Sequence, residues 1–282
     1  MPDAFLESSV VIGLLFRHAG ERTACEQAIP AGAIRACSRY VQYEVARGFL
    51  RSLLALYNIS FEYDSYADLH QEAYSGQRRF RSYEMHTWLG AFTDFEAALE
   101  TEDEALSQAQ KVEEFRAKLR GWIRRGWARL QRDFDLSIDE VGCRDPLPAP
   151  FARVDGRMEQ IIAVDRCGVA AACKVMAFVN QRRPEMELVA DGLAQLPPSK
   201  SDPETKKRII ALRELAKADP QMGFTGKRSY ECGDAFIAME SPVTHTIVTK
   251  NAKHFVPIAG LLGKQMSVAI TSKSTRPPAA SP

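Results

Sequence analysis

The fold is decided near the end of the chain, where residues 233–270 read GDAFIAMESPVTHTIVTKNAKHFVPIAGLLGKQMSVAI. The apolar spacing over Cys232–Glu240 predicts a helix, and the β-branched run His245–Thr249 predicts a buried strand. A short helix over Ala252–Leu262 and a last strand over Met266–Ile270 follow. Alternating helices and strands are typical of an α/β protein with a parallel sheet, which is the fold class that we predict.

The start of the chain shows the same alternation. We expect a strand over Ala4–Leu6 that runs into a helix over Val10–Phe16, and a second short strand over Ala33–Ala36. Ser38 suits the N-cap of a long amphipathic helix over Arg39–Tyr57. The first part of the chain therefore predicts the opening half of the same α/β unit.

The middle of the chain is mostly helical in pattern, with Pro-rich breaks. We expect helical structure over Phe92–Leu130, Met158–Asn180 and Glu204–Lys217, and breaks at Asp145–Pro150 and Leu196–Pro203. The sequence thus predicts an α/β core from residues 1–57 and 226–270, a helical insertion over 58–225 and a disordered tail over 271–282.

The composition is that of an ordinary globular protein. Its 282 residues carry 37 Lys and Arg against 36 Asp and Glu, and the net charge of +1 excludes a surface that is basic throughout. Its six Cys include no CxxC pair, so we expect reduced thiols in a cytoplasmic protein. The apolar run Val10–Phe16 is too short to cross a membrane and follows Asp3 and Glu7, so we expect no membrane or export segment.

Acidic side chains fall where strands end or helices begin. Glu7 closes the first strand, Glu44 lies one turn past the N-cap of its helix, and Asp234 lies early in the helix before the last strands. The carboxyl ends of parallel strands form a ligand crevice where the strand order reverses. Carboxylates that converge there need protons or cations, and Mg²⁺ or Mn²⁺ held by carboxylates can hydrolyse phosphodiesters. Separate structural roles are the alternative, since Asp234 would also favour the helix dipole.

Basic residues gather in several places that could meet a nucleic acid, and the short runs Arg78-Arg79-x-Arg81 and Lys206-Lys207-Arg208 are weak candidates of this kind. The run from Arg116 to Arg132 is by default a solvated helix face, and its functional alternative is a surface that follows phosphates, helped by Trp122 and Trp127. Lys227 and Arg228 precede Asp234 closely, so they are better placed to contact a backbone phosphate.

Four segments resemble the motifs of PIN-domain nucleases. Leu6-Glu7-Ser8-Ser9-Val10 looks like their opening signature, and Ser38-x5-Glu44-Val45-x2-Gly48 is similar to their second motif. Gly233-Asp234-Ala235-Phe236-Ile237-Ala238 looks like the third, and Ile247-Val248-Thr249-Lys250-Asn251-x3-Phe255 looks like the fourth. The resemblance covers roughly the first 57 and the last 50 residues, and the third and fourth motifs in tandem are its most specific part.

The resemblance implies an α/β/α sandwich and a ribonuclease that uses Mg²⁺ or Mn²⁺. It implies metal ligands at Glu7, Glu44 and Asp234, a Ser9 that orients the first acid, and Thr249 and catalytic Asn251 beside the water or the scissile phosphate. Members of the family act as toxins of toxin–antitoxin pairs and as RNA-processing factors. RNA is therefore the expected partner and DNA the alternative, and the insertion could bind a second copy or another protein.

Three positions depart from the family's pattern. Glu7 stands where the family usually has Asp, Asn251 where many members carry a fourth acid, and His254 where a further Asp is common. These departures leave open a catalytically inactive PIN-like binding or assembly module. A helical interaction protein that resembles the family by chance is the other alternative, because the middle takes more than half of the chain.

Overall fold

The computed structural model describes residues 3–17, 19–75, 82–99, 106–141, 149–160, 174–197, 202–218 and 226–270. Its centre is a sheet of five parallel strands in the order β3-β2-β1-β6-β7. These strands are β1 (Asp3–Leu6), β2 (Arg35–Ser38), β3 (Leu136–Ile138), β6 (His245–Thr249) and β7 (Gln265–Val268). The predicted α/β class with a parallel sheet is therefore confirmed.

The strand order reverses between β1 and β6. β2 and β3 lie on one side of β1, whereas β6 and β7 lie on the other. Phe5 of β1 lies opposite Ala36 of β2 and Ile247 of β6, and all three side chains are buried. β1 and β6 are thus central strands covered on both faces, and their carboxyl ends meet at the place where an open parallel sheet binds ligands.

The two ends of the chain also supply the helices that flank the sheet. They are α1 (Ser8–Phe16), α2 (Ala19–Ala28), α3 (Arg39–Val45), the π-helix η1 (Ala46–Leu50), α4 (Arg51–Ile59), α11 (Gly226–Glu240) and α12 (Ala252–Leu261). The predicted N-cap is confirmed, because the Val41 N–H donates to the Ser38 hydroxyl oxygen at 2.9 Å.

Two predicted strands are wrong in their bounds. β2 begins at Arg35 rather than Ala33, because the residues before it form a turn in which the Ala33 N–H donates to the Pro30 oxygen at 3.1 Å. Gly32 in that turn has a φ of 72°, which favours glycine. β7 runs over Gln265–Val268 and so ends before Ile270.

The middle of the chain holds most of the remaining helices. They are the 3₁₀-helix η2 (Ser60–Glu62), α5 (Tyr66–Ser75), α6 (Ser82–Leu99), α7 (Gln108–Leu130), α8 (Val175–Gln181), α9 (Arg183–Ala194) and α10 (Pro203–Lys217). The helical character predicted for Phe92–Leu130 is present as two helices, since α7 starts anew with a capping box at Ser107.

The helix predicted over Met158–Asn180 is wrong at its start. Met158–Glu159 forms strand β5, which pairs antiparallel with β4 (Phe151–Ala152). The hairpin turns at Gly156, whose φ is +80°, and both amide atoms of Asn58 hydrogen-bond the backbone of Met158, at 2.8 and 2.9 Å. Residues 161–173 and the predicted tail over 271–282 lie outside the described residues.

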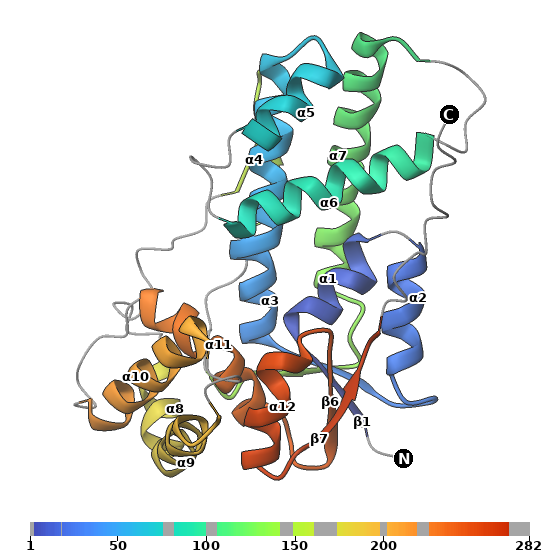
Figure 1. Cartoon of the computed structure of the whole chain (residues 1–282). Coiled ribbons are helices and arrows are strands. Elements are labelled where there is room, and N and C mark those ends of the chain that lie inside the picture. Colours follow the sequence, from blue (N-terminus) through green and yellow to red (C-terminus); the bar gives the residue numbers. More distant parts are fainter. Residues whose placement is uncertain are drawn as a thin grey trace, which may run out of the picture.

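The helices from the middle form two groups on the α/β core (Figure 1). α5, α6 and α7 rise above the sheet together with α4 from the first part of the chain, and α8, α9 and α10 lie beside α11 and α12. The middle also adds β3 to the edge of the sheet, and α7 packs on α1 so closely that a side chain at Gly126 would overlap the ring of Phe16. None of the described helices combines the length and the apolar character needed to cross a bilayer.

Candidate functional site

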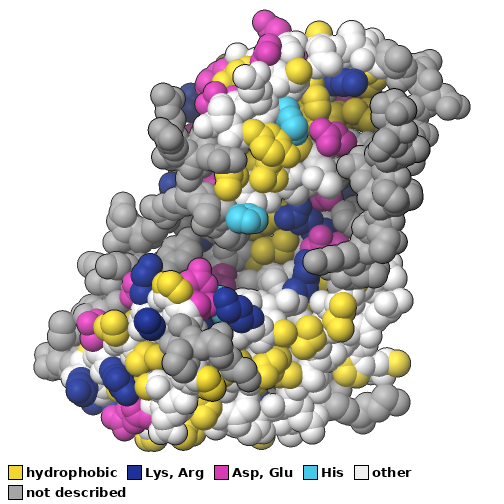
Figure 2. Space-filling view, in the orientation of Figure 1, with side chains coloured by type: hydrophobic (Ala, Val, Ile, Leu, Met, Phe, Trp, Pro, Cys, Tyr) yellow, Lys and Arg dark blue, Asp and Glu magenta, His cyan; other side chains and the backbone are white. Residues whose placement is uncertain are grey.

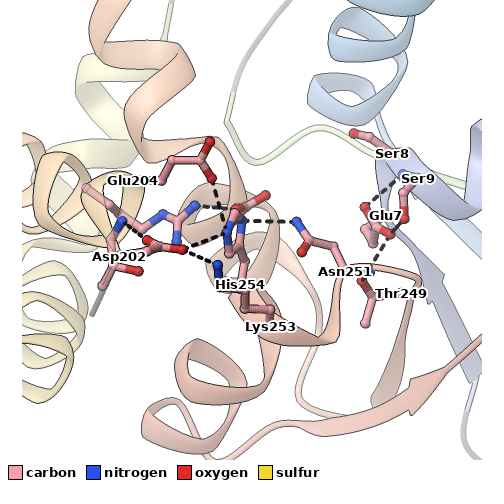
Figure 3. Close-up of polar contacts among 12 residues, drawn as sticks. Glu7, Ser8, Ser9, Asp202, Glu204, Thr249, Asn251, Lys253 and His254 are labelled. Atoms are coloured by element: carbon pink, nitrogen blue, oxygen red, sulfur yellow. Dashed lines mark hydrogen bonds and ion pairs between the residues drawn. The ribbon is translucent and has the colours of Figure 1, made fainter. Parts of the chain in front are cut away.

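Glu7 lies at the switch point, directly after β1, and caps the N-terminus of α1. One carboxylate oxygen, Oε2, accepts a hydrogen bond from the Ser9 N–H at 2.8 Å. The other, Oε1, accepts from the Ser9 hydroxyl, from the Thr249 hydroxyl at 3.0 Å and from the Lys250 N–H at 3.2 Å (Figure 3). Residues from both sides of the reversal in strand order therefore fix the orientation of this side chain.

The carboxyl group of Glu7 is almost removed from solvent. Only 3% of the residue is exposed, and burial raises its pKa in spite of the hydrogen bonds that it accepts. The negative charge of Asp234 raises this pKa further. Burial therefore favours a protonated or cation-bound Glu7 over a free carboxylate.

Glu44 lies on α3 beside the same corner of the sheet. Its Oε2 accepts a hydrogen bond from the Ser8 hydroxyl at 2.5 Å, and its Oε1 lies against Gly233 of α11, where a side chain would overlap it. Burial raises the pKa of Glu44 to about 7, and the charges of Asp234 and Glu7 act in the same direction. The structure thus brings these three carboxyl groups within electrostatic range of one another.

Asp234 is held from two other helices. Its Oδ2 accepts a hydrogen bond from the Arg208 guanidinium of α10 and lies 3.1 Å from Nδ1 of His254 on α12. The Asp234 carboxylate raises the pKa of His254. The partners of Asp234 are therefore basic side chains, whereas those of Glu7 are hydroxyl groups and backbone N–H groups.

Asn251 connects the two groups. Its backbone N–H donates to the Thr249 hydroxyl at 2.8 Å, and its amide Nδ2 lies 3.0 Å from Nδ1 of His254. Figure 3 shows the Asn251 side chain directed at His254 rather than at Glu7. The four segments that the sequence singled out are thus joined through side-chain and backbone contacts at one corner of the fold.

A second acidic group lies next to this corner. His254 Nε2 is 3.2 Å from Glu204 Oε2 and 3.8 Å from Asp202 Oδ2. Within the described ranges these three residues form the only set of three or more potential metal ligands whose donor atoms all lie within 4.8 Å. The carboxylate oxygens of Glu7, Glu44 and Asp234 therefore do not all lie within 4.8 Å of one another in this structure.

The acids of the second group have local partners. Asp202 caps α10 by accepting from the Thr205 N–H at 2.7 Å, and Lys253 Nζ lies 2.5 Å from its Oδ2. Lys253 and the Thr205 N–H together hold the pKa of Asp202 well below its usual range. Glu204 lies in the first turn of α10, where the helix dipole favours an acid. These contacts account for the group without a metal.

The outcome differs among the residues that the sequence singled out. Glu7, Ser9, Thr249 and Glu44 come together at the switch point, whereas Asp234 and Asn251 lie beside it and contact His254. The side chains of Lys227 and Arg228 lie outside the described part of the chain, although their backbone belongs to α11.

The sequence singled out Arg208 only as part of the basic run 206–208, a candidate phosphate contact, and its pairing with Asp234 was missed. Arg208 lies on the buried face of α10, between Thr205 and Leu212, where the helical period expects an apolar side chain. A basic residue at such a position signals a buried acidic partner, and its place in the pattern could have drawn attention to it.

Figure 2 shows the surface hollowed between α5 and α6 above and α10 and α12 below, with basic and acidic side chains side by side along the lower part.

Comparison of the chain with protein-family models, with curated proteins and with solved structures finds no match in any of the three. Function is therefore inferred from the residues of this corner and their geometry.

Proposed function

We propose that this protein is a PIN-like nuclease that hydrolyses RNA with Mg²⁺ or Mn²⁺ held by Glu7, Glu44 and Asp234. The observation that carries the proposal is the place of Glu7, at the reversal of strand order between β1 and β6. Buried at that point, it shares an electrostatic environment with two further carboxyl groups.

The connectivity of the corner supports the resemblance to PIN-domain nucleases. The first motif contacts the fourth through Glu7 and Thr249, and it contacts the second through Ser8 and Glu44. The second motif contacts the third where Glu44 lies against Gly233. Segments that are far apart in the sequence thus lie together at one corner of the fold, which supports the proposal.

The donor set suits a hard divalent cation. Glu7, Glu44 and Asp234 offer only carboxylate oxygens, which Mg²⁺ and Mn²⁺ prefer. Such a cation would replace the protons that burial favours on Glu7 and Glu44, and its chemistry is to activate water for phosphodiester hydrolysis. Ser9 and Thr249 hold Glu7 in its orientation, and Ser8 holds Glu44. The Asn251 amide, which lies 3.0 Å from His254 here, would donate to a phosphate oxygen in the substrate complex.

RNA as the substrate agrees with the charge on α7. Arg120, Arg124 and Arg125 are exposed there, and the helix carries no acid beyond Glu114. Exposed guanidinium groups attract a phosphate backbone of either nucleic acid, so the choice of RNA over DNA rests on the resemblance alone.

The test is calorimetric titration of Mn²⁺ into the wild-type protein and Asp234→Asn, followed by Mg²⁺-dependent cleavage of a mixed-sequence RNA. We expect Asp234→Asn to lose Mn²⁺ affinity and cleavage by more than the 10- to 100-fold that loss of an outer-shell partner costs. Asp191→Asn is the matched control, because Asp191 pairs with Arg213 at the surface. Cleavage that survives in Asp234→Asn would contradict the proposal.

A catalytically inactive PIN-like binding module is the second candidate. The contact of Arg208 with Asp234 favours it, because the guanidinium already neutralises one proposed ligand. The presence of Asn251 and His254 at positions where the family often has acids points the same way. RNA binding without Mn²⁺ binding and without cleavage would identify this function.

A further inference from the structure

Arg208 reaches from the middle of the chain into the candidate site. Its side chain is only 7% exposed, and its Nη2 donates to Oδ2 of Asp234. Arginine keeps its positive charge at every accessible pH, so this contact places a permanent cation on Asp234. The low exposure strengthens the attraction, because water screens it less.

The same oxygen of Asp234 also faces His254, at 3.1 Å from Nδ1. Both partners belong to the side of the site that is away from Glu7, since Arg208 lies on α10 and His254 on α12. Asp234 is thereby drawn toward these helices, and its oxygens do not join those of Glu7 and Glu44 within 4.8 Å. A divalent cation that used Asp234 would have to displace the guanidinium from Oδ2.

We infer that Arg208 is a built-in competitor for the divalent cation, and that α10 thereby sets the affinity of the carboxylate site for metal. In the metal-free protein the guanidinium neutralises Asp234. When metal binds, Asp234 exchanges one positive partner for another, and the side chain of Arg208 moves away from Oδ2. This role rests on the proposed function, because it requires Asp234 to be a ligand.

The experiment is calorimetric titration of Mn²⁺ into the full chain carrying Arg208→Met, which keeps the length of the side chain and removes its charge. We expect Arg208→Met to bind Mn²⁺ about ten- to hundredfold more tightly than the wild type, as the loss of one charged hydrogen bond implies. Arg208→Lys, which keeps the charge, should stay nearer to the wild type.

Arg213→Met is the matched control. Arg213 lies on the same helix, pairs with Asp191 and is half-exposed, so its loss changes the net charge equally without touching Asp234. We expect its Mn²⁺ affinity to equal that of the wild type. A gain in Arg213→Met as large as in Arg208→Met would overturn the inference, because net charge alone would explain it.

The remaining outcomes separate this inference from the proposed function. Equal Mn²⁺ affinity in wild type and Arg208→Met overturns the competitor role and leaves the metal site standing. No Mn²⁺ binding in any variant overturns the metal site itself, and the competitor role with it. Thermal melting checks that each variant folds, and if Arg208→Met does not, Arg208→Gln decides by the same criterion.

Discussion

The carboxyl groups at the sheet and those beside α10 are stabilised in opposite ways. Glu7 accepts hydrogen bonds from hydroxyl groups and backbone N–H groups, and burial raises its pKa. Asp202 and Asp234 lie against Lys253 and Arg208, and the pKa of Asp202 is lowered. The environment of Glu7 favours a protonated or cation-bound carboxyl group, and that of Asp202 favours an ionised one.

The difference indicates which acids call for a cation from outside the protein. Lys250 follows β6 directly, yet its ammonium group pairs with Glu21 of α2, and only its backbone N–H reaches Glu7. Arg47 lowers the pKa of Glu44, but burial raises it more, whereas beside α10 the charges of Lys253 and Arg208 contact the acids directly. A divalent cation therefore has most to stabilise at Glu7 and Glu44, which is where the fold places the switch point.

Glu44→Gln is expected to produce the largest effect on stability. The pKa of Glu44 is raised from 4.5 to about 7 in the fold, so the native state holds a proton that the unfolded state has lost between these values. The free energy of unfolding of the wild type therefore falls as pH rises from 4.5 to about 7, and this whole loss is present above pH 7. In metal-free buffer at about pH 8, the free energy of unfolding of Glu44→Gln should exceed that of the wild type by up to about 3 kcal/mol.

Urea denaturation at about pH 8 and about pH 4 measures this difference, which should vanish at the lower pH. Glu187→Gln is the control, because Glu187 is exposed on α9 and its loss should leave stability unchanged at both values. A Glu44→Gln variant that is less stable than the wild type at pH 8 would show that the protein itself neutralises Glu44. Glu44 would then not differ from the acids beside α10.

Thr249→Val is expected to have the next largest effect. The Thr249 hydroxyl donates to Glu7 and accepts from the Asn251 N–H, and the residue is fully buried. Valine keeps the shape and removes both hydrogen bonds, so the buried Glu7 carboxyl and the partly buried Asn251 N–H each lose a partner. The free energy of unfolding should fall by about 1–3 kcal/mol.

Urea denaturation checks this value, with Thr246→Val as the matched control in the same strand. Thr246 is also buried in β6, and it lies at the end of the strand remote from Glu7. We expect a smaller loss there. Equal losses at both positions would mean that the hydroxyl of Thr249 contributes no more than an ordinary buried threonine, and that the hydrogen bonds to Glu7 are weak.

The parts of the fold that the sequence predicts are those encoded by neighbouring residues. His245–Thr249 has the β-branched composition of a buried parallel strand, and the structure forms β6 over these residues. Ser38 has the side chain of an N-cap, and it caps α3. Leu136–Ile138 carries no such signal, because β3 is a three-residue edge strand that becomes a strand only by pairing with β2.

The candidate site follows the same division. Acids that end a strand or start a helix can be found from local pattern, and Glu44 lies against Ser8, the neighbour of Glu7 at the switch point. The pairing of Arg208 with Asp234 depends on how α10 packs against α11, and no spacing in the sequence specifies that contact. Counter-charges from distant helices are therefore the part of a site that a single sequence conceals.

Asp202→Asn is expected to have the smallest effect, and one of opposite sign to Glu44→Gln. Asparagine caps helices as well as aspartate does, so the variant loses only the charge that faces Lys253 and the start of α10. Because the folded pKa of Asp202 is lowered, its contribution is present above the unfolded value of 3.8 and is lost as pH falls below it. At neutral pH the variant should lose about 0.5–1 kcal/mol of unfolding free energy.

Urea denaturation at neutral pH, at low and at high salt, measures this loss, which should shrink in salt because Lys253 is 68% exposed at its side chain. Lowering the pH below 3.8 should bring wild type and variant together progressively, because the contribution is fully lost only when Asp202 is protonated in the folded chain as well. If Asp202→Asn instead gained stability at neutral pH, the acids beside α10 would be as poorly neutralised as Glu44. The distinction between the two halves of the site would then be lost, and a cation from solution would be needed at Asp202, Glu204 and His254 as well.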